Sequence, residues 1–340
     1  MNKIRFSVIG LNHGHIYSQV RLLLRAGAEL VSFYAPEPEL RQQFAAEYPD
    51  ARLAGSEREI LEDDSIGVIA SAGIPADRAP LGIAAMRHGK DYLVDKPGFT
   101  TLEQLAEVRR VQAETGRIYS IYYSERLASP STVRAIELVR EGAIGQVIQT
   151  LSVGPHRAGL SHRPPWFFER ERYGGIICDI ASHQFDQFLA ITDSKKATVV
   201  ASQVANFAHP DHPGLEDFGD VMLQGEGCTG YIRVDWFTPE GLNSWGDGRV
   251  TVLGTEGYIE VRKNIDLEGR PGGDHLFLVD KTKTHYFDCS GVHCPFGDQL
   301  THDIIHRTET AMTQEHCFLA SELALRAQAG AMRLGHLNMS

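Results

Sequence analysis

Segments of strand and helix character alternate through the first third of the chain. Apolar runs predict buried strands at residues 4–9, 30–34, 66–70, 92–94 and 118–123, and helical patterns separate them. Gly27 and Gly89 end two of these helices. Strands joined by helical crossovers run parallel, so the alternation predicts a doubly wound α/β sheet covered by helices on both faces.

The pattern changes after about residue 124. A helix at 130–140 leads into a strand at 147–153, and a loop rich in proline and aromatic residues follows at 154–173. Residues 197–287 have the pattern of strands joined by Gly, Asp and Asn turns, and two helical patterns end the chain. We therefore predict two domains. The first, at 1–123, holds the parallel sheet, and the second, at 124–340, is an α+β domain with a large open, mainly antiparallel sheet.

Charge and composition exclude several classes of partner. The formal net charge of −11 argues against nucleic acid or an anionic membrane surface, because both are bound through clustered Lys and Arg. No apolar run is long enough to span a bilayer or to form a signal-peptide core, so we expect a cytoplasmic protein. The five cysteines contain no Cys-x-x-Cys pair, which disfavours a disulfide framework or a zinc knuckle.

Three residues suggest acid–base chemistry. Lys96 follows the predicted strand at 92–94, and the carboxyl ends of parallel strands are where ligands collect in such sheets. Asp179 and His183 are four residues apart, so they would share one helix face, which Asp186 extends. A strand-end lysine is often only a solvated charge, and an Asp/His pair is often a surface hydrogen bond.

The turn after the first strand is a candidate phosphate-binding loop. It reads Gly10-Leu11-Asn12-His13-Gly14-His15, where a dinucleotide fold turns backbone amides toward a pyrophosphate. Against Gly-x-Gly-x-x-Gly only Gly10 fits, since Asn12 and His15 hold the second and third glycine positions. Both a phosphate loop and an ordinary strand-to-helix turn therefore stay open.

The end of the second strand should carry an acid that binds the adenosine ribose of a dinucleotide. Ala35 occupies the expected position, and Glu37 follows two residues later, behind a proline. No arginine next to it marks a 2′-phosphate, so the residues leave both NAD and NADP possible.

Two segments together resemble the Gfo/Idh/MocA oxidoreductase family. Residues 89–97, ending in Asp95-Lys96-Pro97, match its Glu-Lys-Pro segment, and residues 174–183 match its Gly-Gly-x-x-x-Asp-x-x-x-His segment. The resemblance implies a Rossmann domain, a second domain whose open sheet forms the oligomer interface, and a cofactor between the domains. It further implies NAD(P)-dependent oxidation of a secondary alcohol of a sugar, cyclitol or sugar derivative, within a homodimer or homotetramer.

The resemblance also implies roles for individual residues. His183 would take the hydroxyl proton, Asp179 would orient the imidazole or hold a substrate hydroxyl, and Lys96 would stabilise alkoxide charge. We expect NAD or NADP as the cofactor and favour NAD. The residues expected to bind it are Gly10, Asn12, His13, Glu37, Asp95 and Lys96. Departures from the family are the weak glycine loop, Ala35 in place of an acid, and Asp95 in place of Glu.

The sequence gives weaker signals for a substrate site and for a metal site than for the catalytic residues. In the loop at 154–173 we favour His156 for substrate hydroxyls and Trp166 for stacking on a sugar ring, although a solvated loop would also fit. The His13/His15 pair and the His209/His212 pair lack a third ligand nearby in sequence, so we expect no metal site. Two other functions stay open. One is an NAD-dependent glycoside hydrolase that works by transient oxidation and elimination, and the other is a non-catalytic dinucleotide-binding sensor.

Overall fold

The computed structural model describes residues 3–335, and contacts divide the chain into two units. The first contains the chain up to Tyr122 together with Pro295–Phe318, and the second contains Tyr123–Cys294 and the chain from Leu319 onward. The division after Tyr122 lies next to the predicted boundary. The segment Pro295–Phe318 differs from the prediction, because it packs with the first unit although it follows the second in sequence.

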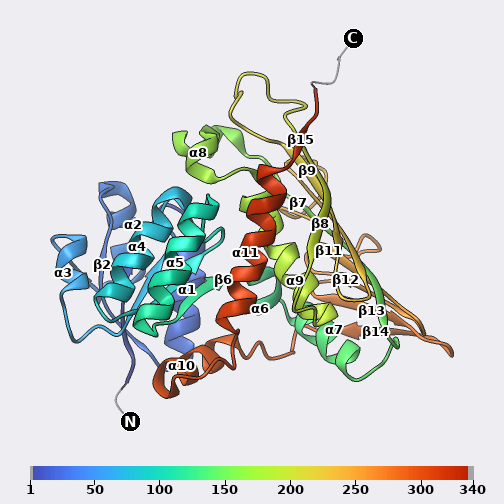
Figure 1. Cartoon of the computed structure of the whole chain (residues 1–340), viewed down its shortest axis with the longest axis horizontal. Helices are drawn as coiled ribbons and strands as arrows, with labels where there is room; N and C mark the ends of the chain where they lie inside the picture. The colour runs from blue at the N-terminus through green and yellow to red at the C-terminus, as the bar shows by residue number, and fades with distance from the viewer. Residues whose placement is uncertain (1–2, 336–340) are drawn as a thin grey trace. The chain divides into compact units, whose positions relative to one another are not determined.

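The first unit is built on a six-stranded parallel sheet, as predicted. Its strands are β1 (Arg5–Ile9), β2 (Glu29–Tyr34), β3 (Arg52–Leu53), β4 (Val68–Ser71), β5 (Asp91–Asp95) and β6 (Tyr119–Tyr122). Its helices are α1 (His15–Arg25), α2 (Pro38–Glu47), α3 (Glu57–Leu61), α4 (Pro75–Arg87), α5 (Leu102–Thr115) and α10 (Phe296–His306). Figure 1 shows α4 and α5 side by side, and their contacts are extensive.

The strand order is β3-β2-β1-β4-β5-β6, the Rossmann arrangement. The order reverses between β1 and β4, so the connections that leave these two strands turn to opposite faces of the sheet. Strands β4, β5 and β6 are buried along their whole length, which is the reason for their continuous apolar runs. The carboxyl ends of β1, β2, β4 and β5 therefore meet at the edge where this fold binds ligands.

The second unit is built on a nine-stranded sheet in the order β14-β13-β12-β11-β7-β10-β9-β8-β15. Its strands are β7 (Val147–Pro155), β8 (Thr198–Ala205), β9 (Phe218–Gln224), β10 (Thr229–Asp235), β11 (Arg249–Gly254), β12 (Tyr258–Arg262), β13 (His275–Val279), β14 (Thr284–Asp288) and β15 (Met332–Arg333). Only the β7–β10 and β8–β15 pairs are parallel among the described residues, so the sheet is mainly antiparallel, as predicted.

Helices cover one face of this sheet (Figure 1). The remaining helices are α6 (Ser124–Leu127), α7 (Pro130–Arg140), α8 (Arg170–Tyr173), α9 (Ser182–Thr192) and α11 (Gln314–Ala329), with short 3-10 turns at Leu160–His162 and Pro165–Phe168. Helix α7 packs on β12 and β13, and α9 packs on β7. Gly154 of β7 allows this approach, since a Cβ there would lie 3.0 Å from the Gln184 side chain of α9.

The opposite face of the large sheet, here called the outer face, carries exposed apolar side chains. Its register aligns one row of opposed residues across the strands, namely Ala201, Met222, Tyr231, Leu151, Thr251, Glu260, Phe277 and Tyr286. Met222 is 53% exposed, and Leu151 and Tyr286 are each 42% exposed. Residues 3–335 therefore cover the sheet on one face only. No helix among residues 3–335 is long and apolar enough to cross a membrane.

Candidate functional site

The turn between β1 and α1 brings the backbone of two strand ends together. Gly10 has φ +86°, and a Cβ there would lie 2.8 Å from the Cα of Gly73 in the turn after β4. Glycine is required at this position by both its φ and its close contact. Helix α1 begins at His15, and the backbone N–H groups of Asn12 and Gly14 meet no acceptor within the described residues. Such amides at a helix N-terminus suit a phosphate group.

Glu37, the acid that the sequence offered near the second strand, lies three residues after the end of β2. It is the N-cap residue of α2, and its Oε1 accepts a hydrogen bond of 2.7 Å from Nδ2 of Asn12. Its other oxygen, Oε2, is buried and has no hydrogen-bond partner in the described structure. An unpaired buried carboxylate oxygen is costly. The residues therefore fit a nicotinamide dinucleotide, whose ribose hydroxyls would donate to this oxygen.

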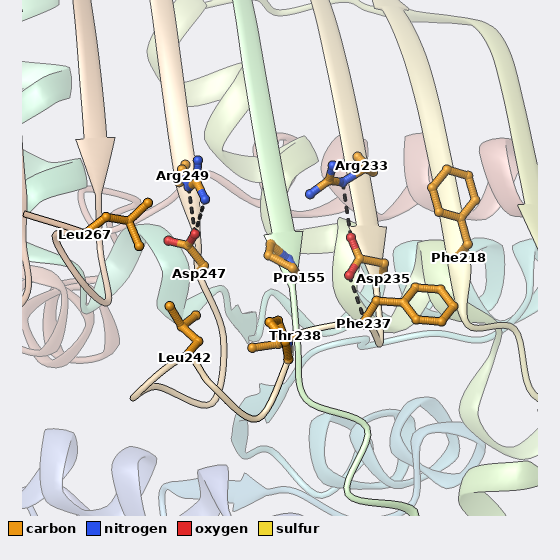
Figure 2. Close-up of a pocket in the computed structure, with 11 residues that line it drawn as sticks. Pro155, Phe218, Arg233, Asp235, Phe237, Thr238, Leu242, Asp247, Arg249 and Leu267 are labelled. Carbon is orange, nitrogen blue, oxygen red and sulfur yellow. Dashed lines mark hydrogen bonds and ion pairs between the residues drawn. The ribbon is translucent and has the colours of Figure 1, made fainter. Parts of the chain in front are cut away.

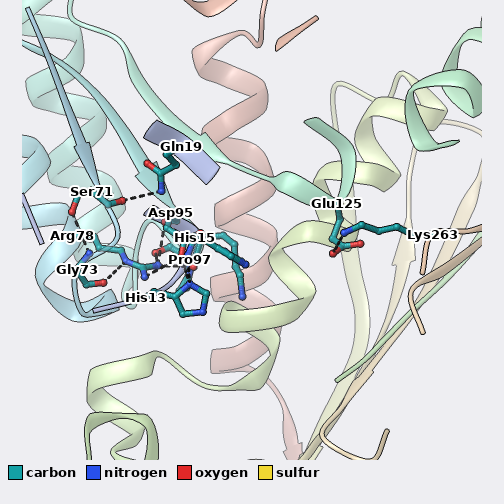
Figure 3. Close-up of polar contacts among 11 residues, drawn as sticks. His13, His15, Gln19, Ser71, Gly73, Arg78, Asp95, Pro97, Glu125 and Lys263 are labelled. Carbon is teal, nitrogen blue, oxygen red and sulfur yellow. Dashed lines mark hydrogen bonds and ion pairs between the residues drawn. The ribbon is translucent and has the colours of Figure 1, made fainter. Parts of the chain in front are cut away.

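Asp95, at the end of β5, connects to both histidines of the β1–α1 turn (Figure 3). Its Oδ1 lies 2.9 Å from Nδ1 of His15, and its Oδ2 lies 3.1 Å from Nδ1 of His13. The His13 and His15 rings meet edge to face with centroids 4.2 Å apart. Arg78 of α4 approaches the same carboxylate, with Nη2 3.3 Å from Oδ2.

Arg78 also fixes the backbone that carries Lys96 (Figure 3). Its Nη1 donates to the carbonyl oxygens of Asp95, Lys96 and Pro97 at 3.1, 2.5 and 3.0 Å, and its Nε donates to Gly73 O at 2.8 Å. Arg78 is 1% exposed and Lys96 is 6% exposed. A buried guanidinium thus sets the position of the Asp95-Lys96-Pro97 segment, which sequence reasoning alone did not indicate.

The charges in this cluster shift the protonation of its members. Burial by itself raises the pKa of Asp95, but His15, Arg78 and His13 outweigh it and hold that pKa well below its usual value. Burial and the neighbouring His15 lower the pKa of His13 to about 4. At neutral pH the cluster thus contains an ionised Asp95 and a neutral His13.

Asp179 and His183 lie in adjoining segments of the second unit and not in one regular α-helix. Asp179 belongs to a π-helical turn, Ile177–Ala181, and His183 belongs to α9, which begins at Ser182. The Asp179 backbone N–H donates to Gly175 O at 2.8 Å. His183 is 2% exposed, and its ring meets that of Tyr123 edge to face at 6.4 Å. Single π turns of this kind are frequent at functional sites.

Asp186 has a structural contact. Both of its oxygens accept hydrogen bonds of 2.7 Å from Arg126, and its side chain is fully buried. A bidentate pair with arginine engages both carboxylate oxygens and fixes their geometry. The expected extension of the Asp179/His183 face to Asp186 therefore ends in an ion pair with α6.

The loop after β7 holds one predicted substrate residue in an aromatic cluster. The ring of His156 contacts Trp236 and Trp245 with centroids 5.5 and 4.7 Å apart, and its Nδ1 lies 3.0 Å from Gly154 O. Trp166 is half-buried and meets only Phe167, at 6.3 Å, among the aromatic rings of the described chain. The tryptophans beside His156 are thus Trp236 and Trp245, both distant from it in sequence.

Arg163, from the same loop, faces Asp179. Its guanidinium carbon lies 4.4 Å from the Phe167 ring centroid and 5.0 Å from that of Trp236. Burial lowers the pKa of Arg163, and the charge of Asp179 opposes this shift. Arg163 therefore places a cation near the predicted acid of the second unit. Its aromatic neighbours, Phe167 and Trp236, are 69 residues apart in sequence, so no local pattern predicted this arrangement.

A separate pocket lies at the end of the outer face and contains none of the predicted site residues. Its volume is about 470 Å³, and two ion pairs, Arg233 with Asp235 and Arg249 with Asp247, flank Pro155 in it (Figure 2). Pro155 aligns with Asp235 across the β7–β10 pair. Its neighbour Gly154 faces α9, so Pro155 faces the opposite side of the sheet. This pocket is therefore distinct from the surroundings of His183.

Comparison with known proteins identifies the family. Residues 4–123 match the model of the oxidoreductase family with an NAD-binding Rossmann fold, and residues 132–260 match that of the GFO/IDH/MocA C-terminal domain. The chain belongs to the Gfo/Idh/MocA oxidoreductase family. This membership makes it an NAD(P)-dependent dehydrogenase, as the two sequence segments indicated.

Relatives with assigned reactions are distant. The chain is 25% identical to scyllo-inositol 2-dehydrogenase (NAD(+)) of Bacillus subtilis (strain 168), over 85% of this chain and 84% of that one. It is 27% identical to 1,5-anhydro-D-fructose reductase of Ensifer adhaerens, over 70% and 69%. A crystal structure from Erwinia carotovora atroseptica SCRI1043, of a protein classed as an oxidoreductase, is 47% identical with a TM-score of 0.96, covering 98% of this chain and 100% of that one.

Proposed function

We propose that this protein is an NAD-dependent dehydrogenase that oxidises a secondary alcohol of a sugar, cyclitol or sugar derivative. The choice of substrate class is supported by the names of the relatives, which act on inositol and on a sugar derivative. The choice of NAD rests on one observation, the unpaired Oε2 of Glu37 at the end of β2. A carboxylate accepts hydrogen bonds from ribose hydroxyls, whereas it would repel a 2′-phosphate.

In this proposal the dinucleotide is held by residues of the first unit. Gly10 allows the close turn, Asn12 positions Glu37, and His13 and Asp95 line the adjoining strand ends. Lys96 follows Asp95 and belongs to the same segment, which Arg78 fixes. When bound, the nicotinamide supplies the acceptor for the hydride of the alcohol carbon.

The proton chemistry is assigned to three side chains. His183 takes the hydroxyl proton, because a neutral imidazole is a base near physiological pH. Asp179 orients this imidazole or holds a neighbouring hydroxyl, and the positive charge of Arg163 attracts its carboxylate. Lys96, whose burial strengthens its field, stabilises the alkoxide that forms as the proton leaves. The proposal thus assigns the base to His183 and the alkoxide-stabilising cation to Lys96.

We also propose where the substrate is recognised. His156 donates to or accepts from its hydroxyls, with the ring held by Trp236 and Trp245. Trp166 stays a proposed stacking surface, since it is half-buried in the loop before the π turn. Arg163 joins them as a hydrogen-bond donor.

The first experiment is a thermal-shift screen with NAD, NADH, NADP and NADPH, alone and with sugars and cyclitols. NAD or NADH should raise the melting temperature more than the phosphorylated forms. If none of the four raised it, the proposed cofactor would be wrong.

The second experiment concerns His183→Ala, which should abolish turnover while leaving dinucleotide affinity nearly unchanged. The matched control is His302→Ala, which removes an imidazole from α10, where the side chain is 52% exposed. Wild-type turnover in His183→Ala would remove His183 as the base.

We further propose that the outer face joins copies of the chain into a homodimer or homotetramer. Met222 and Leu151 lie exposed in its central row, and exposed apolar patches of this kind mark interaction surfaces. Leu151→Asp should reduce the mass measured by light scattering to that of a monomer. An unchanged oligomer would place the interface elsewhere.

A further inference from the structure

The cluster formed by His13, His15 and Asp95 has the composition of a metal site. One ligand atom from each of these three residues can be chosen so that all lie within 4.8 Å of one another. The sequence offered only the His13/His15 pair, because Asp95 lies 80 residues beyond His15 and reaches it through the fold. We propose that these three residues bind a divalent transition-metal ion of the Zn²⁺ or Co²⁺ type.

The separations between the donor atoms suit such an ion. Ligands at about 2.0–2.2 Å from a tetrahedral zinc are roughly 3.3–3.6 Å apart. The carboxylate of Asp95 presents one oxygen to each ring, at 2.9 Å from Nδ1 of His15 and 3.1 Å from Nδ1 of His13. Widening these gaps by a few tenths of an ångström would admit the ion, and that requires only small rotations of the imidazoles.

The hydrogen bonds of His13 and Asp95 show which atoms would face the ion. The backbone nitrogen of His15 lies 3.3 Å from Nδ1 of His13, which would offer its lone pair to the ion. Asp95 Oδ2, 3.1 Å from the same nitrogen, would offer a second lone pair. Without a metal ion, Asp95 accepts hydrogen bonds from His13 and His15, and a bound ion would take the place of the ring protons in these bonds.

The surroundings determine which ions would bind. Asp95 is the single carboxylate ligand, and Arg78 already approaches its Oδ2 at 3.3 Å. Lys96 follows in the chain and adds a second positive charge nearby. Mg²⁺ and Ca²⁺ depend on several oxygen ligands, so they should bind poorly, whereas Zn²⁺, Co²⁺ and Ni²⁺ gain from two imidazoles.

The site would be open on one side. The side chain of Asp95 is fully buried, while those of His13 and His15 are 29% and 35% exposed. Asp95 would thus hold the ion on its buried side, and one coordination position on the exposed side would stay open to water. Three protein ligands with one open position is the arrangement of catalytic zinc sites.

The test is titration of the full-length, chelator-stripped protein with Co²⁺, followed by visible absorption and equilibrium dialysis. We expect one Co²⁺ per chain with d–d bands, displaced by Zn²⁺ and unaffected by a large excess of Mg²⁺. His15→Gln should weaken binding at least tenfold and lose the bands. The double variant His302→Gln/His306→Gln, which removes a surface histidine pair with ring centroids 4.3 Å apart, should leave both unchanged.

Three results would overturn the proposal. The first is that the wild-type protein binds no stoichiometric Co²⁺. The second is that His15→Gln binds Co²⁺ as tightly as the wild type does. The third is that the d–d bands are lost only in the His302→Gln/His306→Gln variant. Since Asp95→Asn disturbs a buried ion pair, we use it only with a folded-state check by circular dichroism. Dinucleotide binding is measured separately in the presence of EDTA, so failure of the metal site leaves the proposed dehydrogenase function untouched.

Discussion

Glu37→Gln tests whether the unpaired carboxylate oxygen binds the ribose of NAD. In the wild-type protein Oε1 already accepts from Asn12 Nδ2 at 2.7 Å, and only Oε2 is left for a ligand. The glutamine amide oxygen would keep the bond to Asn12. The amide nitrogen would then replace Oε2, so an acceptor of hydrogen bonds becomes a donor.

The size of the effect follows from the bond that is lost. A hydrogen bond to a charged group contributes about 1.5–3 kcal/mol. Since about 1.4 kcal/mol corresponds to a factor of ten, the Kd for NAD should rise roughly 10- to 100-fold. The preference for NAD over NADP should shrink as well, because the negative charge that repels a 2′-phosphate is gone.

Isothermal titration calorimetry with NAD and NADP measures both effects. Glu39→Gln is the matched control, because Glu39 lies on the same first turn of α2 and is exposed. It should bind NAD as the wild type does. An NAD affinity within twofold of wild type in Glu37→Gln, with Glu39→Gln equally unaffected, would refute the role of Glu37.

Three further predictions concern stability. Arg126→Leu removes the bidentate partner of the buried Asp186 carboxylate, so urea denaturation should show a loss of about 3–5 kcal/mol, and a loss below about 1 kcal/mol would contradict the pairing. Gly10→Ala and Gly27→Ala both place Ala at φ +86°, and this backbone strain should lower the stability by about 1–3 kcal/mol in each variant. Only the Cβ at position 10 would also meet close atoms, so the melting temperature of Gly10→Ala should fall further than that of Gly27→Ala. Because the pKa of His13 is lowered to about 4 in the folded state, protonation favours unfolding. Stability measured in EDTA should therefore fall between about pH 6.5 and pH 4, and this part of the fall should be absent in His13→Gln.

The secondary structure of the first unit was largely predictable because it is local. The buried strands are continuous apolar runs, and the helix predicted around residues 130–140 of the second unit is present as α7 at Pro130–Arg140. The placement of Pro295–Phe318 with the first unit was not, since nothing in a helical pattern states which surface the helix packs on. The π turn at Ile177–Ala181 was missed for a similar reason, as its spacing resembles that of an α-helix.

The candidate site also contains residues that the sequence could predict and contacts that it could not. Lys96, Asp179 and His183 stand in segments that a family resemblance could recognise from their order alone. The buried contacts that give such residues their environment come from distant parts of the chain. Arg78 reaches the Asp95-Lys96-Pro97 segment from helix α4, and Trp236 lies beside His156.

By itself, the sequence determined the alternation of strands and helices, the family segments and the residue types available for proton transfer. These depend on short-range periodicity and on spacing within a few residues. The tertiary structure decided that Glu37 has an unpaired oxygen and that Asp95 completes a group with His13 and His15. The physical reason is that hydrogen bonding and charge depend on distances of about 3 Å between side chains, and only the packed chain sets those distances.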